Sequence, residues 1–164
     1  MKKRLALVII VQLALVAVGV APQLSARAAG EEYRVRVAAA DPIDPFRGAY
    51  VVLAYPDLSR GDGSFSADGG LGALEDGRSG PVYVTLAEDD GLLRATGFHR
   101  SRPDSGPYLA CDDRDWQIRC GIESWFASQS EARELGQELA EDGAIAVVRI
   151  DSRGNAALVG LETR

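Results

Sequence analysis

The sequence is poor in lysine and in the nitrogen and sulfur ligands of transition metals. It contains one histidine, two cysteines and one methionine in 164 residues. Both lysines, Lys2 and Lys3, lie at the N-terminus, and from Ala29 onward 14 arginines stand against 24 acidic residues, a difference of −10. Phosphate backbones and anionic lipid surfaces attract Lys and Arg. The excess of acidic residues from Ala29 onward therefore argues against nucleic acids and anionic lipid surfaces as partners of this part of the chain. We expect no nucleic-acid partner, no metal and no cofactor.

The one long apolar run lies at the N-terminus. A basic tip, residues 2–4, precedes residues 5–21, which are apolar except for Gln12. As a helix these residues rise about 25 Å, and adding residues 22–24 brings the segment near the ~20 residues that span a bilayer. Positive charge before the segment holds the N-terminus in the cytoplasm. The sequence therefore predicts a single pass through a bacterial cytoplasmic membrane, with the rest of the chain exported.

Two interpretations of this segment remain open. A cleaved signal peptide has an apolar core of ~7–15 residues and an A-x-A cleavage site, which Ala26-Arg27-Ala28 supplies. The apolar stretch is longer than that core, which favours a retained anchor. A buried core helix is disfavoured because the stretch has no polar face, and a lipoprotein is excluded because no cysteine lies near the end of the segment. We divide the chain into an anchor, 1–28, and an exported domain, 29–164.

The cysteines are expected to form a disulfide. Cys111 and Cys120 lie on two predicted strands, 108–111 and 116–120, which form a hairpin around residues 112–115. On facing arms, their Cα atoms approach the ~5.5 Å that a bridge requires. Export places them in an oxidising compartment. The alternative is a pair of reduced, buried thiols, whereas zinc is disfavoured by the spacing and by the absence of a nearby histidine.

The exported part is predicted to be rich in strands. Alternating or apolar runs bounded by turn residues predict further strands over 31–38, 49–55, 81–87, 92–97, 144–150 and 156–161. The strand over 49–55 is apolar on both faces, so we expect it to be central and covered on both sides. Segment 121–127 leads into one helix, which a capping box of Ser128 and Glu131 begins and Gly143 ends. The expected fold is a β-dominated α+β domain, a small antiparallel sandwich or partly open barrel, after one transmembrane helix.

The strand over 49–55 and its approach carry a family resemblance. Residues 48–55, Gly-Ala-Tyr-Val-Val-Leu-Ala-Tyr, resemble the motif of the GDYXXLXY family of membrane-anchored bacterial proteins. The matching positions are Gly48, Tyr50, Leu53 and Tyr55, whereas Ala49 stands where the family has Asp. Asp41, Asp44, Arg47, residues 120–126 and residues 159–161 also resemble the family. The resemblance implies a single-anchor protein that accompanies a multi-span membrane protein, and so it implies a partner and no particular chemistry.

No catalytic set is assembled along the sequence. Asp41 and Asp44 stand beside prolines, where aspartate caps turns, and with Arg47 they also suggest an ion cluster. His99, with Ser101 and Asp104, offers the residue types of a triad on one polar loop, predicted over 99–106, but a triad needs side chains converging on a scaffold. The glycine-rich loop expected over 61–80 matches neither a dinucleotide fingerprint nor a calcium repeat.

The leading hypothesis is therefore a membrane-anchored binding or accessory domain, held in the bilayer by residues 5–21 and partnered by a multi-span membrane protein. One alternative is an envelope hydrolase that uses Asp41, Asp44 or Glu123. The other is a secreted domain that begins at Ala29 after cleavage.

Overall fold

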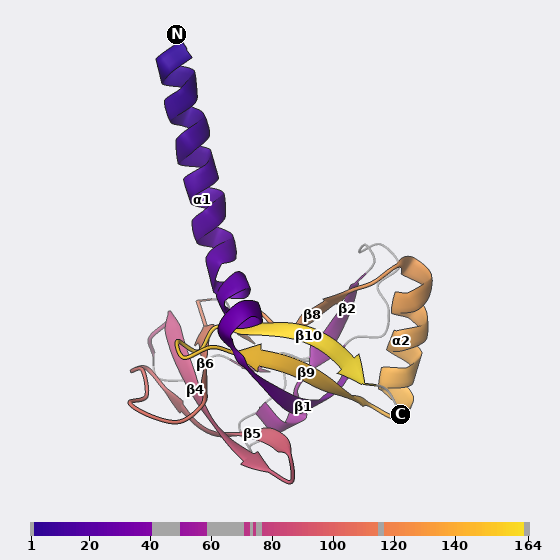
Figure 1. Cartoon of the computed structure of the whole chain (residues 1–164). Coiled ribbons are helices and arrows are strands. Elements are labelled where there is room, and N and C mark those ends of the chain that lie inside the picture. Colours follow the sequence, from indigo (N-terminus) through magenta and orange to yellow (C-terminus); the bar gives the residue numbers. More distant parts are fainter. Residues whose placement is uncertain are drawn as a thin grey trace.

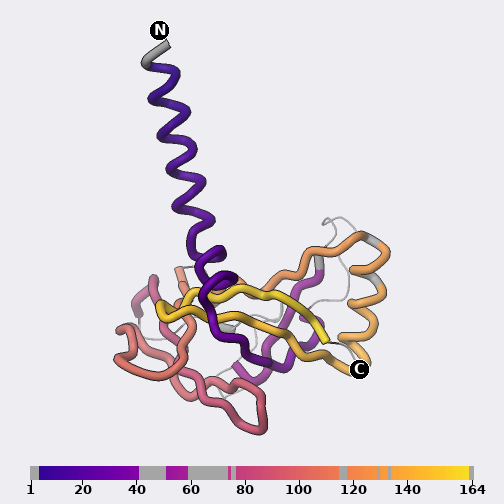
Figure 2. Tube along the Cα trace, in the orientation of Figure 1, coloured from indigo at the N-terminus to yellow at the C-terminus, as the bar shows by residue number. Residues whose placement is uncertain are grey.

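The computed structural model describes residues 2–40, 50–58, 71–72, 74, 77–114 and 117–162. It comprises α1 (Lys2–Ala29), β1 (Glu31–Ala39), β2 (Tyr50–Ala54), the 3-10 helix η1 (Pro56–Leu58), β3 (Leu71–Gly72), β4 (Pro81–Asp89), β5 (Leu92–His99), β6 (Tyr108–Asp112), β7 (Gln117–Ile118), β8 (Ser124–Phe126), α2 (Gln129–Glu141), β9 (Ala144–Ile150) and β10 (Ala156–Glu162). Figure 1 shows α1 standing away from a β-rich domain, and Figure 2 follows its path into β1.

The strands form antiparallel sheets. The largest has the order β10-β9-β1-β2-β8, a second has the order β5-β4-β6, and β3 pairs with β7. The long ladder between β1 and β9 pairs Glu31 with Ile150 at one end and Val37 with Ala144 at the other. This arrangement confirms the expected β-dominated α+β fold with one short helix after an N-terminal apolar helix.

The core lies where alternate residues of these strands point inward. In β1, Val35 and Val37 are buried between exposed arginines, as a strand with one wet face requires. Inward residues of β4, β5, β6 and β9 join them in one cluster, which Leu139 of α2 also enters. Burying each such side chain contributes about 1.5–3 kcal/mol. Strand β2 lies between β1 and β8, one place from the edge, with Leu53 buried and Val52 half-buried, so it is an inner strand, whereas the central strand of this sheet is β1.

Helix α2 begins and ends where the sequence predicted. The Ser128 hydroxyl accepts the Glu131 backbone N–H, and the Glu131 carboxylate accepts the Ser128 N–H. Together they satisfy two of the N–H groups that a helix start leaves unpaired. After the C-cap Asp142, Gly143 adopts φ 66°, a left-handed conformation that favours glycine.

A buried ion pair orders one end of the second sheet. Asp113, 2 % exposed, accepts two hydrogen bonds from the Arg100 guanidinium at 2.7 and 2.8 Å. The same carboxylate accepts the backbone N–H groups of Gly80 and Leu74. Hydrogen bonds from Arg100, and then from these amides, outweigh the burial that opposes them and hold the pKa of Asp113 below its ordinary value.

The region between β6 and α2 differs from the prediction. The expected hairpin is reduced to one bridge between Asp112 and Arg119, because β6 pairs with β4 and β7 pairs with β3. Segment 121–127 contains strand β8, which pairs with β2, where the sequence indicated only an approach to the helix. His99 is the last residue of β5 and not part of the following loop.

Candidate functional site: the junction of anchor and domain

Helix α1 is exposed along most of its length. Its apolar side chains are open, with Leu15 68 % and Val18 73 % exposed. The segment from Arg4 to Ala29 is long and apolar enough to cross a membrane. From Arg4 to Arg27 a helix rises about 35 Å, close to the ~30 Å hydrocarbon core. A bilayer would therefore cover these side chains and place the two arginines near its opposite surfaces.

The last turns of α1 are hydrogen-bonded into the β9–β10 hairpin. The Ser25 hydroxyl donates to the Asp151 carboxylate at 2.5 Å and accepts from the Arg153 guanidinium at 2.8 Å. Asp151 is 7 % exposed and also accepts the backbone N–H groups of Arg153 and Asn155 and the Asn155 side-chain amide. Burial alone would raise the pKa of Asp151, but these hydrogen bonds, with Ser25 first, keep it below the ordinary value.

Two arginines bind backbone carbonyls across the same junction. The Arg27 guanidinium donates to the Leu158 carbonyl of β10 at 3.1 Å. Arg149 of β9 donates from Nε to the Gly30 carbonyl at 3.1 Å and from Nη1 to the Arg27 carbonyl. The Arg27 carbonyl lies in the last helical turn, where carbonyls lack helical partners. Arg149 therefore both caps α1 and ties it to the sheet.

Small residues allow this close approach. Ala26 is fully buried at the foot of α1. A Cβ added to Gly30 would lie 2.4 Å from the Ala26 carbonyl oxygen and 2.9 Å from the Ile150 backbone nitrogen. Both are backbone atoms, so a side chain at Gly30 requires the helix or β9 to shift. The joint between anchor and domain is therefore a packed contact and not a loose linker.

The cleavage motif seen in the sequence is part of this joint. Ala26, Arg27 and Ala28 all lie in α1, and Ala26 is buried against the domain. Proteases cut segments that open locally, so cleavage of the folded protein here requires this turn to unwind and detach first. The local sequence does not predict the contacts between α1 and the β9–β10 hairpin, because Ser25 and Asp151 are 126 residues apart.

Two of the segments that carry the family resemblance, residues 48–55 and 120–126, are joined where β2 pairs with β8. Strand β2 pairs with β8 through Tyr50 opposite Phe126 and Val51 opposite Trp125. The ladder continues as the Leu53 N–H donates to the Glu123 carbonyl at 2.9 Å. The buried Tyr55 hydroxyl donates to the Ile122 carbonyl at 2.6 Å. Burial raises the pKa of Tyr55 well above its ordinary value, and the neighbouring Glu123 charge adds to the effect.

Glu123, a candidate hydrolase residue, holds a turn. Its carboxylate accepts the backbone N–H groups of Cys120 and, at 3.0 Å, of Gly121. The predicted disulfide between Cys111 and Cys120 is present beside this turn. Gln23 of α1 also reaches it, donating to the Gly121 carbonyl at 3.3 Å. The motif strand, the disulfide and the foot of α1 are thus joined through one turn.

The other predicted site residues that the structure describes do not come together. Asp41, Asp44, Arg47 and Gly48 lie outside the described residues. The His99 ring lies 3.4 Å from the Thr85 hydroxyl, while Ser101 and Asp104 are exposed on the following loop. Among the described residues there is no group of three or more His, Cys, Asp or Glu side chains that would hold a metal.

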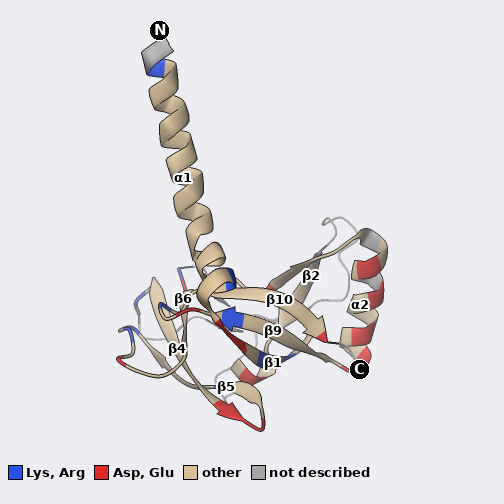
Figure 3. Ribbon diagram, in the orientation of Figure 1, with Lys and Arg blue, Asp and Glu red and all other residues tan. Residues whose placement is uncertain are grey.

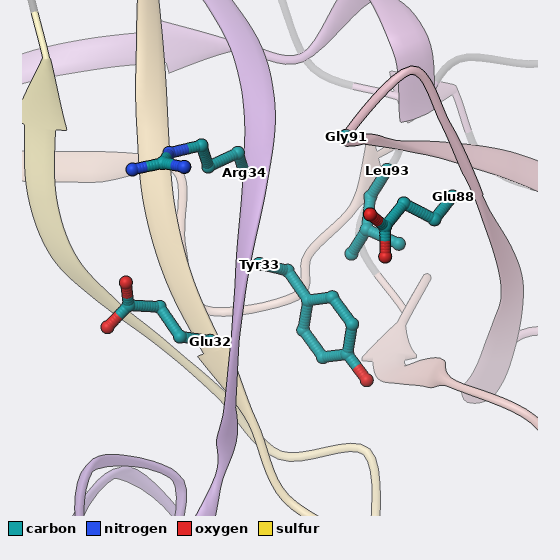
Figure 4. Close-up of a pocket in the computed structure, with 6 residues that line it drawn as sticks. All are labelled: Glu32, Tyr33, Arg34, Glu88, Gly91 and Leu93. Atoms are coloured by element: carbon teal, nitrogen blue, oxygen red, sulfur yellow. The ribbon is translucent and has the colours of Figure 1, made fainter.

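A hollow lies beside β1. It is lined by Glu32, Tyr33, Arg34, Glu88, Gly91 and Leu93 (Figure 4). Glu32 and Arg34 extend on the opposite side of β1 from Tyr33, so the polar groups do not converge. The Tyr33 hydroxyl donates to Glu31 at 2.8 Å, and burial followed by this bond raises the pKa of Tyr33 to about 12. The lining offers no nucleophile paired with a base.

The fold and the junction together define a small β-domain carried on a single candidate membrane helix and hydrogen-bonded to that helix. The chain belongs to the GDYXXLXY family, whose model matches residues 12–161. The match begins within α1 and ends in β10, so it includes the junction as well as the motif strand. Comparison with curated proteins and with solved structures gives no match.

Proposed function

We propose that this protein is a membrane-anchored accessory subunit, with α1 in the bacterial cytoplasmic membrane and the β-domain on the extracytoplasmic side. In this proposal it associates with a multi-span membrane protein. The observation that carries the proposal is the packed junction, above all the bond between Ser25 and Asp151. A domain fixed to its anchor is presented at a defined place above the bilayer, which suits a subunit that docks on a neighbouring membrane protein.

The topology is supported by charge and by the disulfide. The basic tip precedes α1, and Lys and Arg are enriched in cytoplasmic segments next to a span. The Cys111–Cys120 disulfide fits an oxidising compartment on the other side. Both features favour a cytoplasmic N-terminus and an exported domain.

Within the span, Gln12 marks where a partner helix would bind. Gln12 is exposed on α1 and surrounded in sequence by apolar residues. A side-chain amide in hydrocarbon without a hydrogen-bond partner is costly, and amides join helices across membrane interfaces. In this proposal a polar group of the multi-span partner satisfies Gln12.

The test is co-purification of the full-length chain from its native membranes in a mild detergent. Gln12→Leu removes the amide. Ala14→Leu adds apolar bulk about 200° around the helix, on the face away from Gln12, and serves as the control. We expect one multi-span protein to accompany the wild type and the Ala14→Leu chain, and its recovery to fall several-fold with Gln12→Leu.

Absence of any reproducible membrane companion of the wild type contradicts the accessory role. Equal recovery with both variants contradicts the assignment of Gln12 while leaving the companion established.

A further inference from the structure

Three arginines from separate elements surround the foot of α1. Arg27 belongs to its last turn, Arg149 to β9 and Arg153 to the β9–β10 turn. In Figure 3, basic segments colour the foot of α1 and part of β9, whereas acidic residues colour much of α2, the end of β4 and the start of β1 beside the foot of α1. The distribution therefore departs locally from the acidic balance of the domain as a whole.

Protein contacts hold these guanidinium groups without using all their donors. The acceptors of Arg27 and Arg149 are the backbone carbonyls of Leu158, Gly30 and Arg27. Arginine has five N–H donors, and these bonds use one in Arg27 and two in Arg149. Arg153 bonds to Ser25, and its side chain is 62 % exposed. In the contacts that the described residues make, each of the three guanidinium groups is held in place by the protein. Each still has N–H groups that could donate to an acceptor outside the protein.

Acidic groups nearby offset part of this charge, but protein groups already occupy acceptor positions on two of them. Asp151 is buried and accepts from Ser25, Asn155 and backbone amides, and its distance to the Arg153 guanidinium is 3.8 Å. The Glu31 carboxylate accepts the Tyr33 hydroxyl. Glu31 and Glu32 are both exposed, and Glu32 stands opposite Arg149 in the β1–β9 ladder, so both carboxylates oppose an anion at this place.

We propose that Arg27, Arg149 and Arg153 bind the headgroup phosphate of an anionic glycerophospholipid in the leaflet that faces the domain. This rests on the proposed insertion of α1, because the end of a membrane-spanning helix lies at the headgroup level. A guanidinium presents N–H groups in a fork that matches two phosphate oxygens. A phosphate held by one arginine of the helix and two of the hairpin bridges anchor and domain and fixes how the domain tilts over the bilayer.

The test uses purified full-length protein in lipid nanodiscs made of equal parts phosphatidylglycerol and phosphatidylcholine. Native mass spectrometry counts the lipids that stay bound when the disc is removed. Hydrogen exchange over residues 149–155 reports whether the lipid acts at the hairpin. The variants are Arg153→Gln and the pair Arg27→Gln with Arg153→Gln, and the control is Arg94→Gln, which removes an exposed arginine of β5 paired with Asp89.

We expect the wild type and Arg94→Gln to retain phosphatidylglycerol in preference to phosphatidylcholine, with slower exchange at the hairpin than in pure phosphatidylcholine discs. Because each basic residue near an anionic surface contributes to binding, retention should fall about fivefold for each arginine removed. Equal retention of the two lipids by the wild type, or equal retention by wild type and the double variant, overturns the proposal. These outcomes do not depend on the protein partner, so they separate this proposal from the accessory role.

Discussion

The Ser25 hydroxyl of α1 donates a hydrogen bond to the Asp151 carboxylate of the β9–β10 turn, across 126 residues of sequence. Asp151 would be a buried, charged group with less compensation if α1 were removed, because the Ser25 bond is among the contacts that keep its pKa low. The domain is therefore built to receive the end of the helix. This contact makes the end of α1 part of the folded unit.

Substitution of Gly30 tests the packing of the junction. Gly30→Ala places a Cβ 2.4 Å from the Ala26 carbonyl oxygen, whereas Gly19→Ala, within the exposed part of α1, meets nothing within 4 Å. We expect Gly30→Ala to lower the free energy of unfolding by about 1–3 kcal/mol, as overpacking does, and Gly19→Ala to leave it nearly unchanged. Chemical denaturation in detergent, followed by tryptophan fluorescence, measures both. Equal effects of the two substitutions would contradict a packed joint.

Stability should fall in acid because of Asp113 and Asp151. Both carboxyls have a pKa below the ordinary 3.8 in the folded protein. Their contribution is present above the unfolded-state pKa and is lost as the pH falls through the depressed folded-state value. We expect the thermal midpoint to hold between about pH 7 and pH 5 and to drop below about pH 4. Asp151→Asn should lower the free energy of unfolding at neutral pH by about 1–3 kcal/mol and make the thermal midpoint fall less steeply below about pH 4. Asp104→Asn, an exposed control, should change neither.

The hydroxyl of Tyr55 should contribute more to the free energy of unfolding than the hydroxyl of Tyr83. Tyr55→Phe leaves the Ile122 carbonyl without its buried donor, at a cost of about 1–3 kcal/mol. Tyr83 packs edge-on against Tyr108 at 5.9 Å between ring centroids, and Tyr83→Phe keeps that contact, so we expect a change within about 0.5 kcal/mol. Thermal unfolding of the two variants decides the matter. A harmless Tyr55→Phe would show that the motif tyrosine does not hold the turn.

Removing the disulfide should destabilise the domain without abolishing the fold. The Cys111–Cys120 bridge closes a loop with a sequence separation of 9. In the chain-entropy model a loop of this size contributes about 2–3 kcal/mol. Replacing both cysteines with serine should therefore lower the thermal midpoint, and adding a reductant to the wild type should reproduce the shift. If the reductant leaves the wild-type midpoint unchanged, the bridge contributes little.

Local signals in the sequence were enough to locate α2 and the longer strands, but not β3 or β8. Ser128 with Glu131 located the start of α2, and the turn 151–155 between two apolar runs located β9 and β10. The pairing of Cys111 with Cys120 followed from their positions on adjacent segments and from the expected export. In each case the partners lie within a few residues or on consecutive elements, where spacing carries the information.

Contacts between distant segments could not be predicted in this way. Strand β8 has three residues, too few for an alternation to show, and it exists because β2 provides its ladder from far along the chain. Ser25, Arg27, Arg149 and Asp151 are ordinary residue types in ordinary local contexts. Their role depends on how the β9–β10 hairpin packs against α1, and the spacing of apolar residues along the sequence does not predict that packing. The sequence instead directed attention to Ala26-Arg27-Ala28 as a cleavage site.

The central claim is that α1 stays attached to the domain as one folded unit in the membrane. The most direct test is the intact mass of the protein extracted from the membranes of the cells that make it. We predict a mass that includes the whole of α1, recovered from the membrane fraction. A mature chain that begins at Ala29 and is found free of the membrane would contradict the account, and with it the junction's role in holding an anchor.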